Sequence, residues 1–380
     1  MTDPASSRCP STEPTSRRGL LRTVCAAALA GCATRSGDRQ TPADIDAWPP
    51  SEHRDVLTLG HPWSGWPAWT ADAFDAADVS VTPCNANGLD IDRSLSERLL
   101  EGHHGVSLLG AQDWWIEDRA GARAHRLPID RLPGAAALSD RATDTAAFAQ
   151  PGRPRTVPLS VEPSVLAYDT TAFPAPPSSL SVLFDESRAG RVAVEGRVVN
   201  LRPMVAALAL GQHPARPSDT DAIAEATARL YEQQYDGEVR ASGRDYDRRQ
   251  VAMLADGAVD VGLFPWHVAF AARFEADAPV EFVVPREGTL YRTHGLVVPR
   301  GAPAPLAALR LANWALQPRN AARLVTAAGR RPAVDVSDHV SPAHREFLSL
   351  PADRRYVHND LLPEEVSVAY GEIERQVETA

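Results

Sequence analysis

Short apolar runs alternate with amphipathic segments along most of this 380-residue chain. The runs 55–60, 79–83 and 105–110 have the length of strands, and the segments 68–77 and 95–102 between them have helical spacing. A strand–helix–strand order forms a crossover unit, which places parallel strands side by side and helices on the faces of the sheet. The sequence therefore predicts an α/β fold.

The same alternation starts again near residue 191. Expected strands at 191–196, 259–265 and 280–285 are separated by helical patterns, and Pro318 divides a long helical stretch near the end. The helical patterns cover residues 200–211, 219–235, 247–258 and 267–276. Two alternating regions predict two lobes, each with a mixed sheet flanked by helices.

The N-terminal segment has the features of an export signal. "SRRGLLR" at 16–22 is a twin-arginine pattern, and the apolar run after it is too short to span a bilayer permanently. The run ends in "LAGC", which resembles the lipobox of bacterial lipoproteins. We therefore expect residues 1–31 to be a signal peptide, Cys32 to carry the lipid, and residues 32–52 to form a lipidated tether. The protein would then be held at the periplasmic or outer face of the cell membrane.

Composition and motifs exclude several other classes of protein. The net charge of −10 argues against a general nucleic-acid binder. Beyond the expected anchor the only cysteine is Cys84, so the mature chain can form no internal disulfide, which fits export after folding in a reducing cytoplasm. Zinc patterns, a P-loop, a nucleophile elbow and a dinucleotide fingerprint are all missing. We expect no metal, no cofactor and no enzymatic activity.

The second half of the chain resembles a known family. Residues 259–334, which begin "VDVGLFPWHVAFAARFEA", are similar to the spermidine/putrescine-binding branch of the extracellular solute-binding proteins of ABC importers. "PSSLSVLFDESRAGRVAV" at 177–194 and "YVHNDLLPEEVSVAYGEIERQV" at 356–377 resemble other segments of these proteins. The resemblance implies a type II periplasmic-binding-protein fold, with two lobes, a hinge and an interlobe cleft.

The same resemblance implies lobe boundaries and a role. Residues 53–160 and 293–337 would form the first lobe and residues 161–292 and 338–380 the second, with crossing strands near 158–164 and 290–296. A monomer anchored through Cys32 would capture a small solute and deliver it to an ABC permease and its ATPase, since an acyl anchor raises its effective concentration at the membrane. A sensory or scaffolding lipoprotein of the same fold is the alternative.

The residues at the expected ligand site differ from those of the polyamine-binding branch. That branch uses aromatic rings and carboxylates to hold a cationic solute, whereas the matching positions here are Arg292, His294, Arg330 and His358. Glu195 is the only acid near the branch's paired carboxylates. An unpaired Arg repels a polyamine, and its fork matches carboxylate or phosphate oxygens. We therefore expect an anionic or zwitterionic solute; the alternatives are retained spermidine/putrescine binding and basic residues that are merely exposed at lobe rims.

Tryptophans complete the expected ligand site. Trp63 follows the first expected strand, and Trp114 and Trp115 follow the third, at the strand ends where α/β folds bind ligands. Trp266 follows the strand 259–265, where the resemblance implies an aromatic ligand contact. Each indole is suited to stacking on a solute, and each is equally suited to packing against the core.

Overall fold

The computed structural model describes residues 41–45, 48–50, 56–60, 81–85, 106–112, 123–143, 154–195, 200–235, 246–358 and 362–379. Their contacts divide the chain into two compact units. The first unit includes residues before Ala137, a segment that ends at Val157, and Gly295–Gln317. The second unit includes Pro158–His294 and Pro318–Ala380, so residues 318–337 join the second unit rather than the first lobe expected for them. Cys32 and residues 1–31 lie outside the described part of the chain.

Three parallel strands form the sheet of the first unit. β1 (Val56–Gly60) pairs with β2 (Val81–Asn85) on one side and with β3 (Val106–Gln112) on the other. These strands lie where the apolar runs predict them. Helix α13 (Pro305–Leu316) packs on β3, and the 3₁₀ helix η2 (Pro42–Asp44) contacts α13, so this part of the expected tether is packed against the first unit.

The second unit contains a mixed sheet built around the long strand β4 (Val157–Asp169). β6 and β7 pair antiparallel with β4, and β5 pairs parallel with β6. β8 lies next to β4, and β9 pairs parallel with β8. The bounds are β5 (Val192–Val194), β6 (Val261–Pro265), β7 (Val280–Val283), β8 (Thr289–Val297) and β9 (Tyr356–His358).

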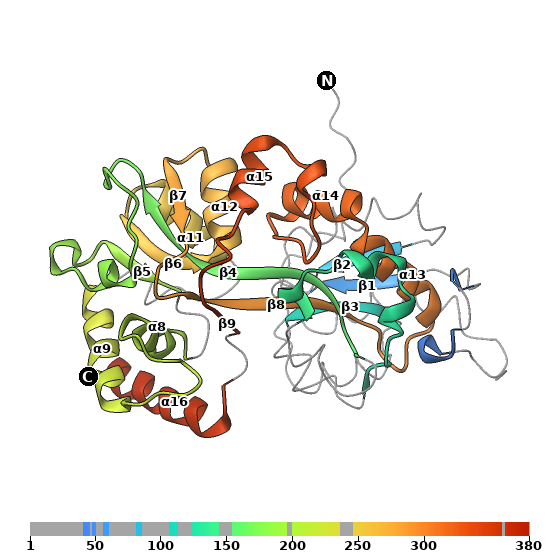
Figure 1. Ribbon diagram of the computed structural model, residues 1–380, viewed down its shortest axis with the longest axis horizontal. Coiled ribbons are helices and arrows are strands. Elements are labelled where there is room, and N and C mark those ends of the chain that lie inside the picture. The colour runs from blue at the N-terminus through green and yellow to red at the C-terminus, as the bar shows by residue number, and fades with distance from the viewer. Residues whose placement is uncertain are drawn as a thin grey trace, which may run out of the picture. The chain divides into compact units, whose positions relative to one another are not determined.

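Helices cover this sheet on both sides. Figure 1 shows α8, α9 and α16 on one side of the strands of the second unit, and α11 and α12 on the other. The bounds are α6 (Asp140–Thr143), α8 (Leu201–Ala209), α9 (Thr220–Gln233), α11 (Tyr246–Ala255), α12 (Trp266–Phe274), α14 (Pro318–Ala328), α15 (Pro342–Leu348) and α16 (Glu364–Thr379). Short 3₁₀ helices lie at Ile129–Arg131, Pro133–Ala137, Leu180–Phe184, Glu186–Arg188 and Ser337–His339.

Local sequence explains where these helices begin. The Asp219 side chain accepts a hydrogen bond from the backbone N–H of Ala222 at 3.0 Å and caps α9. Pro203 lies in the first turn of α8, as expected, and both α13 and α14 begin with a proline, whose missing N–H is not needed there. Pro318 therefore starts a new helix after α13 ends at Leu316.

Strands β4 and β8 carry the chain between the units. The division falls between Val157 and Pro158 and between His294 and Gly295, close to the crossing segments predicted at 158–164 and 290–296. All nine residues of β8 are buried, including its two basic residues. A buried strand that contains ionisable side chains must provide partners for them.

Gly295 in β8 has no room for a side chain. A Cβ at this position would lie 1.9 Å from Thr156 Oγ1, which makes no hydrogen bond within the described residues. We expect Gly295→Ala to reduce the free energy of unfolding by about 1–3 kcal/mol because it overpacks the strand. Thr156→Ala removes the clashing oxygen without breaking a hydrogen bond in the described part of the chain. Thermal unfolding should show that the double variant recovers stability relative to Gly295→Ala, and no recovery would contradict this account.

Candidate functional site

The four basic residues expected at the ligand site all belong to the second unit, and all are buried. The exposed fractions are 7% for Arg292, 0% for His294, 3% for Arg330 and 6% for His358. They are therefore not charges displayed at the surface. Buried basic side chains need acidic or hydrogen-bonding partners nearby.

Strand β8 separates these residues into two sets. Arg292 and His294 are two positions apart and share one face of the strand, whereas Thr293 points to the other face. His358 lies on the side of Thr293, with 3.3 Å between its Nε2 and the Thr293 hydroxyl, and its ring meets the edge of Tyr291 at 4.9 Å between centroids. The structure thus brings Arg292, His294 and Arg330 together and places His358 on the opposite face.

Glu162 on β4 is the centre of the first set. Arg330 Nη1 donates to Glu162 Oε2 at 2.7 Å, and His267 Nδ1 lies 3.1 Å from the same oxygen. The other ring nitrogen of His267 lies 3.4 Å from Asp247 Oδ2. The Asp247 side chain is 42% exposed and so connects these buried residues to solvent. Glu162 itself has a side-chain exposure of 0%. A buried carboxylate is thus held between a guanidinium and an imidazole.

Arg292 and His294 extend this group along β8. Arg292 Nη2 donates to Glu195 Oε2 at 2.5 Å, and both side chains are buried. His294 Nδ1 lies 3.2 Å from the hydroxyl of Ser160, two residues before Glu162 on β4. We call the set Ser160, Glu162, Glu195, Asp247, His267, Arg292, His294 and Arg330 the buried polar network.

Charges within the network set its protonation states. Burial alone would raise the pKa of Glu162, but Arg330, His267 and His294 together hold it well below its usual value, so Glu162 is ionised. Burial and Arg330 lower the pKa of His267, yet Glu162 and Asp247 outweigh them and the net shift is upward. Burial lowers the pKa of His294 to about 3, so its ring is neutral at pH 7.

Sequence analysis alone did not find the acids of this network, except for Glu195, which it noted as the one nearby carboxylate. Glu162 was detectable in principle, because it is the one acid in the mostly apolar stretch 157–168 and points to the same face of the strand as Ser160 and Ser164. Its partner Arg330 is 168 positions away, so only the fold connects them. The network therefore holds three carboxylates against two guanidiniums and two imidazoles, of which His294 is neutral, and the expected cationic excess is compensated.

The tryptophans have different outcomes. Trp266 has an exposure of 0%, stacks on Phe270 at 5.1 Å between ring centroids, and donates its indole N–H to the carbonyl of Phe347 at 3.2 Å. Trp266 therefore packs in the core of the second unit, and neither face of its ring is exposed to a solute. Trp63, Trp114 and Trp115 lie outside the described residues.

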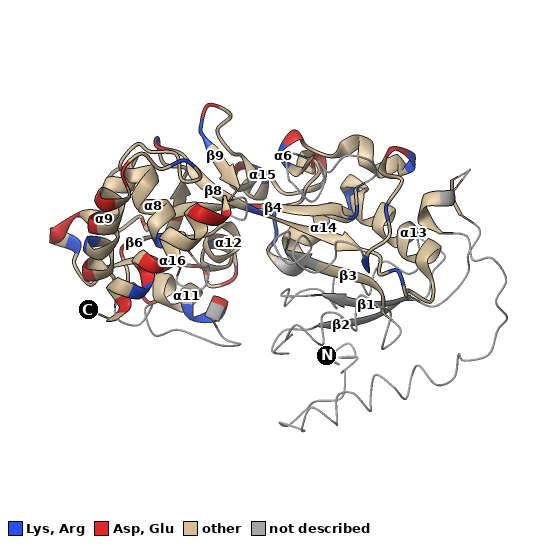
Figure 2. Ribbon diagram, turned by 90° about the horizontal axis from the view of Figure 1, so that it is seen from below, with Lys and Arg blue, Asp and Glu red and all other residues tan. Residues whose placement is uncertain are grey.

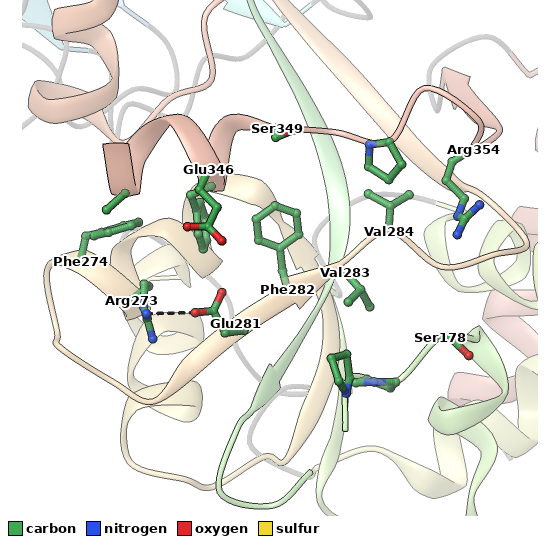
Figure 3. Close-up of a pocket in the computed structure, with 15 residues that line it drawn as sticks. Ser178, Arg273, Phe274, Glu281, Phe282, Val283, Val284, Glu346, Ser349 and Arg354 are labelled. Atoms are coloured by element: carbon green, nitrogen blue, oxygen red, sulfur yellow. Dashed lines mark ion pairs between the residues drawn. The ribbon is translucent and has the colours of Figure 1, made fainter. Parts of the chain in front are cut away.

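A separate pocket of about 580 Å³ lies on the second unit, between α12, β7 and α15. Figure 3 shows Phe282 beside Glu346 and the ion pair between Arg273 and Glu281, whose charged atoms are 3.0 Å apart. None of the expected ligand residues that the structure describes lines this pocket.

The described residues contain no group of three side chains suited to hold a metal ion. None of their helices is both long enough and apolar enough to cross a membrane.

Solved structures with the same fold come from several bacteria. The spermidine/putrescine ABC transporter substrate-binding protein PotD of Streptococcus pneumoniae superimposes with a TM-score of 0.70 at 12% identity, over 86% of this chain and 99% of that chain. The TpPotD lipoprotein of Treponema pallidum gives 0.64 at 14% identity, over 85% and 99%. The binding protein AgtB of A. tumefaciens R10, solved with agropinic acid, gives 0.55 at 18% identity, over 86% and 96%. These similarities confirm the expected mixed α/β fold of the type II periplasmic-binding-protein class.

Sequence comparison assigns the family. Among curated proteins, none matches the chain. The family model described as bacterial extracellular solute-binding protein matches residues 112–345, which is more than half of the chain and includes the whole buried polar network. This chain therefore belongs to the bacterial extracellular solute-binding proteins.

Proposed function

We propose that this protein is the substrate-binding component of an ABC transporter, which captures a small organic solute and delivers it to a membrane permease. The observation that carries the proposal is the family match over residues 112–345, within which the fold assembles a buried polar network. The family consists of binding proteins, and binding rather than catalysis is the role that we assign.

We propose that the solute is zwitterionic. The sequence favours an anionic or zwitterionic solute because Arg292 and Arg330 stand at positions that match aromatic or acidic residues of the polyamine-binding branch. In the structure Glu195 and Glu162 pair with them, so the network carries no large positive excess that would favour a simple anion. It also lacks the acidic excess that a polyamine with several charges would require. A solute with one group of each sign matches such balanced donors and acceptors.

Similar folds hold solutes of different kinds. The S. pneumoniae protein is described as a spermidine/putrescine-binding component, and the A. tumefaciens protein was solved with agropinic acid. This range supports the assignment of the solute from the residues of the network rather than from the fold.

We also propose that the protein is exported by the twin-arginine route and anchored through a lipid on Cys32. The motif order at residues 16–32 supports this location, and a relative of the same fold is described as a lipoprotein. The anchor would hold the protein near its permease, where capture and delivery are coupled.

Thermal unfolding of the full chain, purified in detergent, tests the proposed solute class. The panel contains glycine betaine and phosphocholine as zwitterions, succinate as an anion and spermidine as a cation. At a hundred times its Kd, a bound solute stabilises the folded protein by about 2.7 kcal/mol, which is a clear rise in Tm. We expect a zwitterion to raise Tm and Arg292→Gln to remove the effect.

The matched control is Arg354→Gln, which removes an exposed ion pair with Asp353 on the same unit and should leave the solute effect intact. A rise in Tm with spermidine, and none with zwitterions, would contradict the proposed solute class.

A further inference from the structure

Two arginines, Arg141 and Arg331, lie around Tyr356 in the second unit. The guanidinium of Arg141, on α6, stacks over the Tyr356 ring with 3.9 Å between its carbon and the ring centroid. Arg331 interacts electrostatically with both Arg141 and Tyr356, and its Nε makes only a long hydrogen bond of 3.4 Å to the carbonyl of Leu348. The Tyr356 hydroxyl is occupied, because it donates to the carbonyl of Pro351 at 2.9 Å. We call Arg141, Arg331 and Tyr356 the arginine pair site.

Neither arginine has a carboxylate partner within the described part of the chain. The nearest acid in electrostatic terms is Asp335, but its Oδ1 accepts from the backbone N–H and the hydroxyl of Ser337 at 2.9 and 2.6 Å, and it forms no ion pair with Arg331. Both arginines of the buried polar network, Arg292 and Arg330, have such partners. Burial, and then the charge of Arg141, lower the pKa of Arg331 to about 10, in keeping with two guanidiniums that repel each other.

This site is distinct from the buried polar network. The segment that contains Arg330 and Arg331 runs antiparallel beside β4. The carbonyl of Arg331 accepts a hydrogen bond from Val161 N at 3.1 Å, and Pro332 forms an isolated β-bridge with Ser160. Arg330 contacts Glu162, whereas Arg331 lies with Tyr356, which packs against the small cluster of Val161, Tyr291 and Ala333. Consecutive residues of an extended segment point to opposite faces. The same segment therefore supplies one compensated arginine to the network and one uncompensated arginine to the other face.

The pair lies in a chain whose net charge is negative. The whole protein has a formal charge of −10, and Figure 2 shows acidic residues gathered on α9 and α16 of the same unit. The guanidiniums of Arg141 and Arg331 repel one another by Coulomb interaction, and an anion shared between them would offset this cost.

We propose that Arg141 and Arg331 form a binding site for a small oxyanion, a carboxylate or a phosphate group, that bridges the two guanidiniums beside the Tyr356 ring. Guanidinium forks match the paired oxygens of both groups, and the charge-assisted hydrogen bonds so formed are the strong ones. The stacking of Arg141 on Tyr356 fixes the plane of one fork and leaves its edge for the oxygens. The proposal does not depend on which solute the buried polar network takes.

Titration of the full chain with two anions tests the site and distinguishes the two sources of oxygen. Inorganic phosphate and succinate are added separately, with sodium chloride at equal ionic strength as the reference, and binding is followed by calorimetry and by Tm. We expect at least one anion to bind, and Arg141→Gln and Arg331→Gln each to weaken it at least tenfold. Arg331→Lys, which keeps the charge but not the fork, should weaken it less than Arg331→Gln.

Arg273→Gln is the matched control, because it removes a half-exposed arginine of the same unit that already pairs with Glu281. We expect it to change the affinity less than twofold. The proposal is overturned if neither anion binds beyond the chloride reference, or if Arg273→Gln weakens binding as much as the other variants do. If Arg331→Gln does not fold, Arg141→Gln alone decides, since its side chain is half-buried on a short helix. Loss of anion binding with an unchanged response to zwitterions would separate this site from the proposed function.

Discussion

Replacement of Arg330 by methionine is expected to lower the free energy of unfolding by about 3–5 kcal/mol. Arg330 donates to Glu162 at 2.7 Å, and the two side chains have exposures of 4% and 0%. The variant leaves an ionised carboxylate in the interior, 3.1 Å from His267 Nδ1 and without its guanidinium partner. Urea denaturation monitored by tryptophan fluorescence, with Trp266 in the same unit, measures the change.

Two controls show whether charge, rather than packing, causes this loss. The double variant Glu162→Leu/Arg330→Met removes both charges and should recover most of the stability, because a buried ion pair replaced by apolar side chains is often neutral. Arg354→Met breaks an exposed pair and should cost less than about 1 kcal/mol. If the double variant were as unstable as the single one, the network would act through shape rather than charge compensation.

The stability of the protein is expected to fall as the pH decreases from 6.5 to 4.5, in part through His294. Its pKa is lowered from 6.5 to about 3 in the folded protein, chiefly by burial, with Arg330, Arg292 and His267 adding to the effect and Glu162 opposing it. Between these two values the unfolded chain binds a proton that the folded chain excludes, so acidification favours unfolding. One ring with this shift contributes a loss of about 2 kcal/mol over the two pH units.

His294→Asn should remove this contribution and flatten the dependence of unfolding free energy on pH. The window ends at pH 4.5 because the lowered pKa of Glu162 contributes its own loss below that value. His267 acts in the opposite sense, since its raised pKa stabilises the folded state only until the pH rises through that pKa. His339→Asn, at an exposed position, is the control and should leave the slope unchanged. Equal slopes for the wild type and His294→Asn would contradict the assignment of a neutral, buried ring.

The fold was largely predictable because most of its strands and helices follow from the pattern of neighbouring residues. The strands at 56–60, 106–112 and 261–265 coincide with apolar runs, and α9 begins after an acidic cap at Asp219, so neighbouring residues are enough to define them. Strand β8 was expected from the family resemblance, as a crossing strand near 290–296, rather than from a local apolar pattern. Arg292 and His294 are buried in it with partners from other segments, since Glu195 follows β5 and Ser160 lies on β4.

The sequence indicated the basic residues of the candidate site but not most of the acids that pair with them. The sequence identified Arg292, His294 and Arg330, and the structure joins these three in one network. It did not show that Glu162 neutralises Arg330, because no local pattern links positions so far apart. It also gave no sign that Arg331, one residue further on, lacks an acid. Partnership between charges is a property of the fold, and the sign of the expected solute depends on it.

The most direct test of the account is calorimetric titration of the full chain with glycine betaine, phosphocholine, succinate and spermidine, on the wild type and on Arg292→Gln. We expect saturable one-to-one binding of a zwitterion by the wild type, and its loss in the variant, which leaves Glu195 without its partner. Binding of spermidine by both proteins, with no response to either zwitterion, would contradict the proposed solute class and remove the buried polar network from the ligand site.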